Sequence, residues 1–411
     1  MTLDPVHFEG IARLAARIQQ EVDDTEQHDL AARAWEEFLD PLWADGRAVL
    51  EPIDGLRRRR VAAEDIAIGG SAYPSSHGLD SGTINPRTFK NGLVLDVAQA
   101  AMSACPSDLD VHRSRTVVAT VHSNDETISV DEDHWEAFDE GYGRGRIIHA
   151  PRVNRYERAV VHALSLYLAE SSHALANADA VEDLLILDGP IYPKGILSWL
   201  DRHHELASLL AGAETPREVL ENYIRLVETF VERDIPLVGF VKNVSAKGVI
   251  RAVRESGLPT PWNNDAAFFT QILDAVTTEE LAVTNWFLSR VGPDRVFAAD
   301  NDELDLDAEL DPAAYEVAYC VVYDPRTDLI YKLETPAVFA SDAECRERLT
   351  QHVLGEIATR NGPPAAVSKA DDLAQIGNTE RESLIETIER TFETKEDRSY
   401  DDTRWETMKE Y

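Results

Sequence analysis

Two aspartates directly follow apolar segments that have the composition of buried strands. Asp188 ends the apolar run 184–187, and Asp80 follows Gly78 and Leu79. An ionised carboxylate at the end of a buried strand is costly unless it meets a cation, hydrogen-bond donors or water. Taken singly, such an aspartate is usually a turn former or a helix cap. Taken together, the two aspartates indicate a shared site at one edge of a sheet.

The long helical pattern before Asp188 offers a third carboxylate. If this helix ends near Asn177, the following strand climbs about 16 Å at ~3.3 Å per residue. A helix running the other way covers that height in about 11 residues at ~1.5 Å each. Glu170 is the acidic residue nearest that level, whereas Glu157 lies about 20 Å further along the helix. The spacing predicts that Glu170 faces Asp188, provided that the rotation of the helix allows it; Glu157 is the alternative helix ligand.

Carboxylate oxygens that converge without Cys or His favour Mg²⁺ or Mn²⁺ over zinc. A pair of such ions activates water and stabilises the leaving oxygen in phosphodiester hydrolysis. Lys242, directly after the apolar strand 236–241, is in a position to reach a scissile phosphate. The alternative for Lys242 is a surface ion pair.

Arginines gather just ahead of the helix that carries Glu170. An arrangement of this kind guides a phosphate backbone. The alternative is that these arginines pair with the acidic run 131–140. The cluster consists of Arg144, Arg146, Arg152, Arg155 and Arg158.

Most other common enzyme motifs are absent from the sequence. There is no GxxxxGK[ST] loop, no HExxH pair and no GxSxG elbow. The glycine-rich segment 141–145 follows an acidic stretch and is interpreted as a turn. A carboxylate-pair glycosidase would need aromatic sugar platforms, and Trp199 and Trp262 are isolated. Three widely spaced cysteines predict neither a disulfide framework nor a zinc cluster.

The pattern of elements predicts an α/β fold. Three strands come first, near residues 78–80, 92–97 and 115–121, and a helix over about 154–176 follows. A strand over 184–187, helices over 194–211 and 216–233, and a strand over 236–241 come next. Helices near 246–256 and 264–276, a hairpin over 315–334 and helices after 342 complete the chain. This order predicts a ribonuclease H-like mixed β-sheet core flanked by helices.

The N-terminal region has a different pattern. Apolar residues recur at helical spacing over residues 5–44, so we expect a helical N-terminal arm over 1–62 that precedes the α/β domain over 63–411. The arm either packs on the core or serves self-association or a partner.

The chain is strongly acidic, with 75 Asp and Glu against 40 Lys and Arg and a net charge of −35 over 411 residues. Arginine supplies most of the positive charge. This composition is typical of proteins from a cytoplasm that holds molar salt, where the Debye length falls to about 3 Å and carboxylate repulsion is screened. No signal peptide and no run of 18 apolar residues is present, so a cytoplasmic protein without a membrane segment is expected.

Five short segments resemble the sequence blocks of the NurA nuclease family in their order and spacing. These blocks cover the chain from about 75 to 390. They are Leu79–Gly82, Leu187–Pro190, Gly239–Lys242, Lys332–Pro336, and Gly362–Pro363 followed by Lys369–Asp371. The resemblance implies an archaeal Mn²⁺-dependent nuclease with a ribonuclease H-like core. It further implies 5′-to-3′ exonuclease and single-strand endonuclease activity on single-stranded and double-stranded DNA ends. The implied partners are a second copy of the chain, as a homodimer, and the hexameric translocase HerA, in end resection for recombination and double-strand break repair.

By motif, Asp80 and Asp188 match the two aspartates that bind metal in the family. Glu170 matches the glutamate on the family's helix, and Lys242 matches the basic residue after the fifth strand. The sequence departs from the family in three places. The first motif reads Asp-Ser-Gly instead of Asp-Gly-Ser, and Pro190 replaces a serine. The third departure is Asp371, which stands where the family has histidine. Either Asp371 is a fourth metal ligand, or the position has lost its role and Asp372 or neither contributes. A non-catalytic DNA-repair scaffold that binds the translocase is the alternative function.

Overall fold

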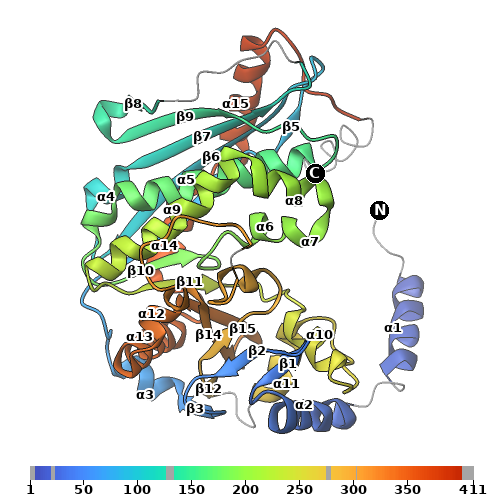
Figure 1. Cartoon of the computed structure of the whole chain (residues 1–411). Coiled ribbons are helices and arrows are strands. Elements are labelled where there is room, and N and C mark those ends of the chain that lie inside the picture. Colours follow the sequence, from blue (N-terminus) through green and yellow to red (C-terminus); the bar gives the residue numbers. More distant parts are fainter. Residues whose placement is uncertain (1–4, 20–23, 126–133, 275–278, 302, 400–411) are drawn as a thin grey trace.

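The computed structural model describes residues 5–19, 24–125, 134–274, 279–301 and 303–399. Its centre is one large mixed β-sheet covered by helices on both faces (Figure 1). This confirms the predicted α/β class. Among the described residues, no helix is long and apolar enough to cross a membrane.

Five strands form the part of the sheet that positions the candidate site. Their order is β7-β6-β4-β10-β11; β4 and β6 are antiparallel, as are β6 and β7, while β10 is parallel to both β4 and β11. All five lie close to segments predicted to be strands. Their bounds are β4 Ser76–Thr83, β6 Val94–Cys105, β7 Arg115–His122, β10 Leu185–Asp188 and β11 Leu237–Val241.

The sheet continues on both sides of these five strands. Beyond β11 lie β15 (Leu329–Pro336) and β14 (Val317–Asp324), which form the predicted hairpin, followed by β13 (Phe287–Ser289), β2 (Arg47–Pro52) and β1 (Leu42–Ala44). Beyond β7 lie β9 (Gly143–His149) and β8 (Glu136–Phe138). Off this path, β12 (Glu280–Thr284) pairs with β14 and β3 (Arg58–Ala62), and β5 (Arg87–Thr88) pairs with β6.

Helices on one face of the sheet bury the apolar side chains that point to that face. The helix α5 (Glu157–Ala176) packs on β6 and β7, and α9 (Glu214–Glu232) packs on α5. Their buried side chains share one core with Leu79, Leu187 and Leu237 of the strands. Shorter helices follow along this side: α6 (Lys194–Leu197), α7 (Trp199–Arg202), α8 (His204–Gly212), α10 (Gly248–Glu255) and α11 (Asp265–Leu273).

The other face is covered by helices from the C-terminal part of the chain. Residues of α13 (Ala343–Arg360) and α14 (Ala365–Ala374) bury Ile186, Val238 and Phe240 of β10 and β11. Thus consecutive residues of β10 face opposite helical layers, as the period of two in a strand requires. The remaining helices are α3 (Ala63–Ile68), α4 (Leu109–Arg113), α12 (Ala337–Ala340) and α15 (Asn378–Thr391).

The N-terminal region differs from the helical arm expected over residues 1–62. Helix is present in α1 (Pro5–Gln19), which stands apart from the rest of the molecule in Figure 1, and in α2 (Asp24–Phe38), which packs on α11. Residues 42–62 instead contribute β1, β2 and β3 to the sheet. The helical interpretation of 42–62 is therefore wrong. Short, partly polar strands such as β3, whose sequence is RRRVA, give little periodic signal.

The glycine-rich segment 141–145 is only partly a turn. Its second half begins β9, which pairs in parallel with β7. A Cβ at Gly143 would lie 2.1 Å from a ring carbon of Phe138, so the glycine makes room for an aromatic ring. Gly143 therefore serves close packing within a strand, whereas Gly141 lies in a turn with a φ of 96°.

Candidate metal centre

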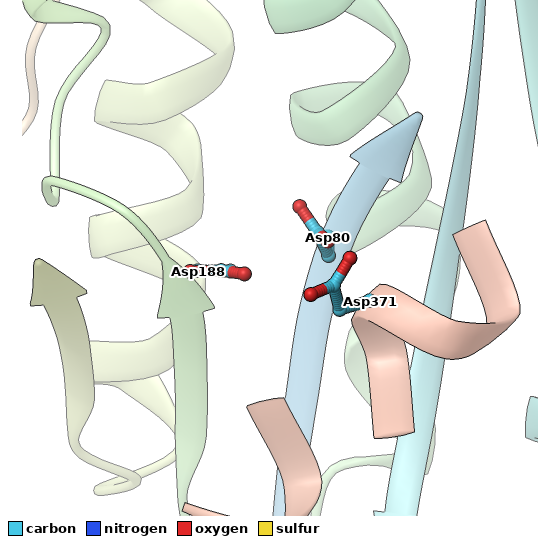
Figure 2. Close-up of side chains that lie close together, drawn as sticks. All are labelled: Asp80, Asp188 and Asp371. Carbon is cyan, nitrogen blue, oxygen red and sulfur yellow. The ribbon is translucent and has the colours of Figure 1, made fainter. Parts of the chain in front are cut away.

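Asp80 and Asp188 lie side by side on neighbouring strands. Leu187 of β10 is in register with Leu79 of β4, so the next residue on each strand falls in the same row. Because the two strands are parallel, both aspartates point to the same face of the sheet. The strand β10 ends at Asp188, so space opens beside β4 at this level. The predicted convergence of these two residues is what the structure shows (Figure 2).

The helix α14 brings a third carboxylate over the same row. This helix lies almost in contact with β4, because Gly78 and Gly82 have no side chains on the facing side. A Cβ at Gly78 would be 2.2 Å from the carbonyl oxygen of Ala366, and one at Gly82 would be 2.2 Å from that of Ala374. This close approach places Asp371 beside Asp80 (Figure 2).

Asp80, Asp188 and Asp371 form a compact cluster of acidic oxygens. One carboxylate oxygen from each residue lies within 4.8 Å of the others. The side chain of Asp188 is 11% exposed and that of Asp371 is 57% exposed, so the cluster opens to solvent on the α14 side. Asp372, the alternative to Asp371, is exposed and does not belong to this group. Three hard oxygen donors without Cys or His fit Mg²⁺ or Mn²⁺.

Glu170 reaches the same region from the opposite face of the sheet. One of its carboxylate oxygens accepts a hydrogen bond from the hydroxyl of Ser81 at 2.6 Å, and the other accepts one from Tyr223 at 3.0 Å. Ser81 directly follows Asp80 and points to the α5 side. Glu157 is the first residue of α5, about 20 Å away along the helix axis. Of the two glutamates considered, Glu170 is therefore the one beside the cluster, although it lies outside the group of three.

Lys242 places a cation among these carboxylates. Its Nζ atom lies 2.5 Å from Oδ2 of Asp188 and 3.6 Å from Oδ2 of Asp371. Lys242 directly follows β11, the parallel neighbour of β10, so it lies at the same edge of the sheet. Lys242 is thus in an ion pair, and its partner is Asp188 of the cluster.

The cluster carries more negative charge than its surroundings can balance. Burial, followed by the charges of Asp188 and Glu170, raises the pKa of Asp80 to about 8. Burial raises the pKa of Glu170 to about 7, although the hydrogen bonds from Ser81 and Tyr223 work against this rise. Burial also raises the pKa of Asp188, against the hydrogen bond and charge of Lys242. A divalent cation would supply the missing positive charge, so the residues present fit such an ion.

Metal binding is expected to weaken as the pH falls from 8 to 6. Asp80, with a pKa near 8, holds a proton at pH 6 that a cation must displace. Protonation of Asp80 alone lowers the affinity roughly fiftyfold over this range. Calorimetric titration with Mn²⁺ in two buffers of different ionisation enthalpy measures both the affinity and the protons released. Equal affinity at both pH values, with no proton release, would contradict the assignment.

The arginines predicted to bind DNA fall into two groups. The Arg144 guanidinium group stacks on Trp135 and donates to Thr116 and to the carbonyl of Ser172. Arg146 forms an ion pair with Glu218 at 2.6 Å. These two side chains are engaged within the protein, because strand β9 carries them against α5 and α9. The structure does not present them as a phosphate surface.

Arg152 and Arg155 are exposed and lie in the loop before α5. They line a surface hollow of about 760 Å³ together with Asn154, His203 and His204. Arg158, on the first turn of α5, donates to the carbonyl of Pro86 at 2.8 Å. The structure therefore brings Arg152 and Arg155 together but separates them from the metal cluster by much of the length of α5.

The sequence analysis named Lys332–Pro336 only as a segment that resembles the family and gave its charged residues no role. Glu334 of β15 is 1% exposed and binds Lys194 at 2.5 Å and Lys332 at 2.7 Å. Its other oxygen accepts from the backbone N–H of Ile191 at 3.3 Å, in the loop after Asp188. The signal was present, since Lys332 and Glu334 interrupt an otherwise apolar strand, but their partners come from distant segments.

Comparisons with known proteins identify the family of this chain. The family model described as the NurA domain matches residues 74–376. A search of curated proteins found no match.

Similar solved structures include the NurA nuclease from Sulfolobus solfataricus, at 12% identity, with 95% of this chain and 98% of that chain covered and a TM-score of 0.46. They also include a NurA bound to dAMP and manganese, at 12% identity, 98% and 99% coverage and a TM-score of 0.44. The family model spans well over half of the chain and contains all three clustered aspartates. This protein belongs to the NurA family.

Proposed function

We propose that this protein is a metal-dependent deoxyribonuclease that hydrolyses phosphodiester bonds at DNA ends. The observation that carries the proposal is the cluster of Asp80, Asp188 and Asp371, whose oxygens lie within 4.8 Å of one another in a member of the NurA family. Mn²⁺ is the proposed cofactor, with Mg²⁺ as the alternative. The structures of NurA proteins bound to manganese support this choice.

In the proposed reaction, Asp80, Asp188 and Asp371 would hold the divalent ions, which when bound would activate the attacking water and stabilise the leaving oxygen. Lys242, beside Asp188, would be in a position to contact a non-bridging oxygen of the phosphate. Ser81 and Tyr223 hold both oxygens of Glu170 in place on the other side of the sheet.

The core architecture supports the same reaction class. The order β7-β6-β4-β10-β11, with three antiparallel strands followed by two parallel ones, is the arrangement expected for a ribonuclease H-like core. Both aspartates of the strands lie where β4 and β10 adjoin. We therefore propose that the core of this protein is ribonuclease H-like.

We also propose that Arg152 and Arg155 contact the DNA backbone outside the cleavage site. They lie about 20 Å from Glu170 along α5, so they would bind phosphates several nucleotides away. Their exposed guanidinium groups are suited to phosphate contacts, which give affinity without sequence preference. Single-stranded and double-stranded ends are both suitable substrates, with 5′-to-3′ exonuclease and single-strand endonuclease activity as the proposed modes.

The direct test is incubation of the purified protein with end-labelled DNA in molar KCl, with Mn²⁺ or with a chelator. Cleavage that requires Mn²⁺ supports the nuclease. Binding of DNA without any cleavage in Mn²⁺ or Mg²⁺ would instead support the non-catalytic scaffold. Labels at the 5′ and 3′ ends in separate reactions distinguish exonuclease polarity from endonuclease cuts.

The proposed cellular role is end resection for double-strand break repair, together with a hexameric translocase of the HerA type. Membership of the NurA family supports this role. The acidic composition supports a cytoplasm rich in salt. We propose a cytoplasmic protein of a halophilic archaeon on these grounds.

The helix α1 supports the proposed homodimer. Its apolar side chains recur three to four residues apart and are largely exposed: Phe8 68%, Ile11 54%, Leu14 59% and Ile18 68%. An amphipathic helix with its apolar face in water gains stability when another surface covers that face. We propose that a second copy of the chain provides this surface.

Replacing Ile11 and Leu14 by aspartate in the full chain is expected to convert the dimer into a monomer. Charge on the apolar face removes the gain from burial, while the sheet core stays intact because α1 stands apart from it. Light scattering after size exclusion in molar KCl measures the mass. Arg13→Glu, also on α1, is the control that leaves the dimer intact. A dimer that persists in the double variant would assign the interface to another surface.

A further inference from the structure

The strand β3 is an edge strand that carries a concentrated positive charge. It pairs with β12 and, within the described part of the chain, with no second strand, and it lies at the rim of the molecule beside α3 (Figure 1). Arg57 directly precedes β3, and Arg58–Arg60 are its first three residues; all four are exposed. No other run of four basic residues occurs in this chain, whose net charge is −35. The proposed reaction makes no use of these arginines.

The backbone of β3 offers hydrogen-bonding groups to solvent. The carbonyl of Arg57 and the N–H of Ala63 bond to the residues that flank β12. In an antiparallel ladder, such bonded positions alternate with positions whose backbone groups point the other way. The N–H groups of Arg58, Arg60 and Ala62 therefore point away from β12, as do the carbonyls of the two arginines. An edge of this kind is a template for a further strand.

The arginine side chains are divided between the two faces of the sheet. Arg58 lies over the ring of Trp35 in α2, and Arg60 donates to a backbone carbonyl just after α11. On the opposite face, Arg59 forms an ion pair with Glu347 of α13 at 2.9 Å. This alternation is that of a strand, whose successive side chains point to opposite faces. A partner that lies along the edge therefore meets positive charge on both of its own faces.

A hollow of about 360 Å³ adjoins the strand on the α13 side. Its charged lining residues are four arginines and two carboxylates, which leave two net positive charges. They are Arg57, Arg58, Arg59, Arg346, Asp54 and Glu347. The Arg346 guanidinium group binds Asp54, and Arg59 binds Glu347. An acidic side chain from a partner that reaches this hollow would balance the remaining charge.

An extended acidic peptide matches these features better than DNA or a second copy of β3. Phosphate groups can accept from the outward N–H groups, but they have no donor for the outward carbonyls of Arg58 and Arg60. A peptide strand supplies both donors and acceptors and places its side chains on both faces. A second β3 would bring arginine against arginine, which opposes pairing. The same charges attract a strand that carries carboxylates.

We propose that β3 is the docking edge for an extended acidic segment of a partner protein, which adds to the sheet as a further strand. The inference goes beyond the proposed nuclease function and does not depend on it. Main-chain hydrogen bonds hold the segment, and carboxylates on its two faces select it. Four strands separate β3 from β10, which places the edge about 24 Å across the sheet from Asp188 at ~4.8 Å per strand. A docked segment therefore leaves the metal cluster open.

The test measures fluorescence anisotropy of labelled decapeptides in molar KCl, where a Debye length of about 3 Å leaves only direct charge contacts unscreened. The first peptide carries aspartate and glutamate on both faces of an extended strand. The second has the same sequence with its backbone amides N-methylated, which keeps the charge and removes the donors. The first peptide is expected to bind at least tenfold more tightly than the second. A single-stranded oligonucleotide of equal charge is the third probe.

Ala62→Pro tests the backbone contact. The φ of Ala62 is −60°, which proline adopts without strain, and its N–H points away from β12. The change therefore removes one outward donor and leaves the ladder with β12 intact. The affinity for the acidic peptide is expected to fall about fivefold, the loss typical of one hydrogen bond, while the thermal midpoint stays unchanged.

Arg57→Glu combined with Arg59→Glu tests the charge. This double variant is expected to bind the acidic peptide at least tenfold more weakly and to bind a peptide with lysine at the acidic positions instead. Arg251→Glu combined with Arg390→Glu changes exposed residues of α10 and α15 by the same total charge and should bind like the wild type. Cleavage of DNA should be unchanged in both double variants, because β3 lies outside the metal cluster.

The outcomes separate strand addition from attraction by charge alone. Equal binding of the plain and the N-methylated peptide, or no binding of either, would overturn the proposal. Wild-type affinity for the acidic peptide in both Ala62→Pro and the β3 double variant would overturn it as well. An oligonucleotide that loses affinity in the β3 double variant, while the peptide does not, would assign the arginines to DNA. Failure of every protein to cleave DNA would refute the nuclease function and leave the docking edge standing.

Discussion

Replacing Asp188 by asparagine is expected to lower the rate of DNA cleavage by about a thousandfold. Asp188 lies beside Asp80 on the neighbouring strand and forms an ion pair with Lys242, so it contacts both the acidic and the basic residues of the site. An amide offers a neutral oxygen in place of a charged one, which weakens both the hold on the ions and the electrostatic stabilisation of the transition state. Single-turnover cleavage of a labelled oligonucleotide in saturating Mn²⁺ measures the loss.

The fold is expected to survive this change. Asparagine has nearly the same shape, and its neutral side chain relieves repulsion from Asp371, although Lys242 loses its charged partner. The two effects oppose each other, so the thermal midpoint should move by only a few degrees. Asp372→Asn is the control, since Asp372 is exposed and outside the cluster. Normal cleavage by Asp188→Asn, or an equal loss in the control, would rule out the proposed site.

Replacing Gly78 by alanine is expected to destabilise the protein by about 3 kcal/mol and to reduce cleavage as well. The new methyl group would meet the carbonyl carbon of Ala366 at 2.3 Å and its oxygen at 2.2 Å. These are backbone atoms, so the clash is relieved only if α14 moves away from β4. Because α14 carries Asp371, a shift of the helix also opens the metal cluster. Chemical denaturation and Mn²⁺ titration measure the two effects separately.

Gly355→Ala is the matched control for this prediction. Gly355 lies within α13, and the nearest atoms to a Cβ there are 3.8 Å and 4.0 Å away, at ordinary contact distance. Alanine favours a helix interior by up to about 1 kcal/mol over glycine, so this variant should be as stable as the wild type or more stable. A stable Gly78→Ala variant with normal metal affinity would show that the close approach of α14 is not required.

The two strand aspartates and the helix glutamate were within reach of sequence reasoning for a physical reason. Leu184–Leu187 is apolar without interruption, which predicts a buried strand, and a charge at its end must meet a partner. The rise per residue of a helix then favoured Glu170 over Glu157, and the structure places Glu170 beside Ser81. These inferences depend on local periodicity and on short connections along the chain.

Asp371 lay outside the range of such reasoning. It reaches Asp80 through the packing of α14 on β4, a contact between segments almost 300 residues apart, and only the family resemblance pointed to it. The arginines also show that sequence reasoning does not reveal tertiary packing. Arg144 and Arg152 look alike in the sequence, but Arg144 lies in a strand that the pattern did not reveal, so its side chain is engaged inside the protein.

The placement of Asp371 on α14 also determines when activity can arise during synthesis of the chain. Asp80 and Asp188 are translated in the first half of the chain, and the strands that carry them are adjacent in the sheet. The ribosome must add a further 183 residues after Asp188 before Asp371 exists, and α14 must then emerge and dock on β4. A nascent or truncated chain that ends before α14 therefore has two of the three clustered carboxylates and lacks the complete cluster.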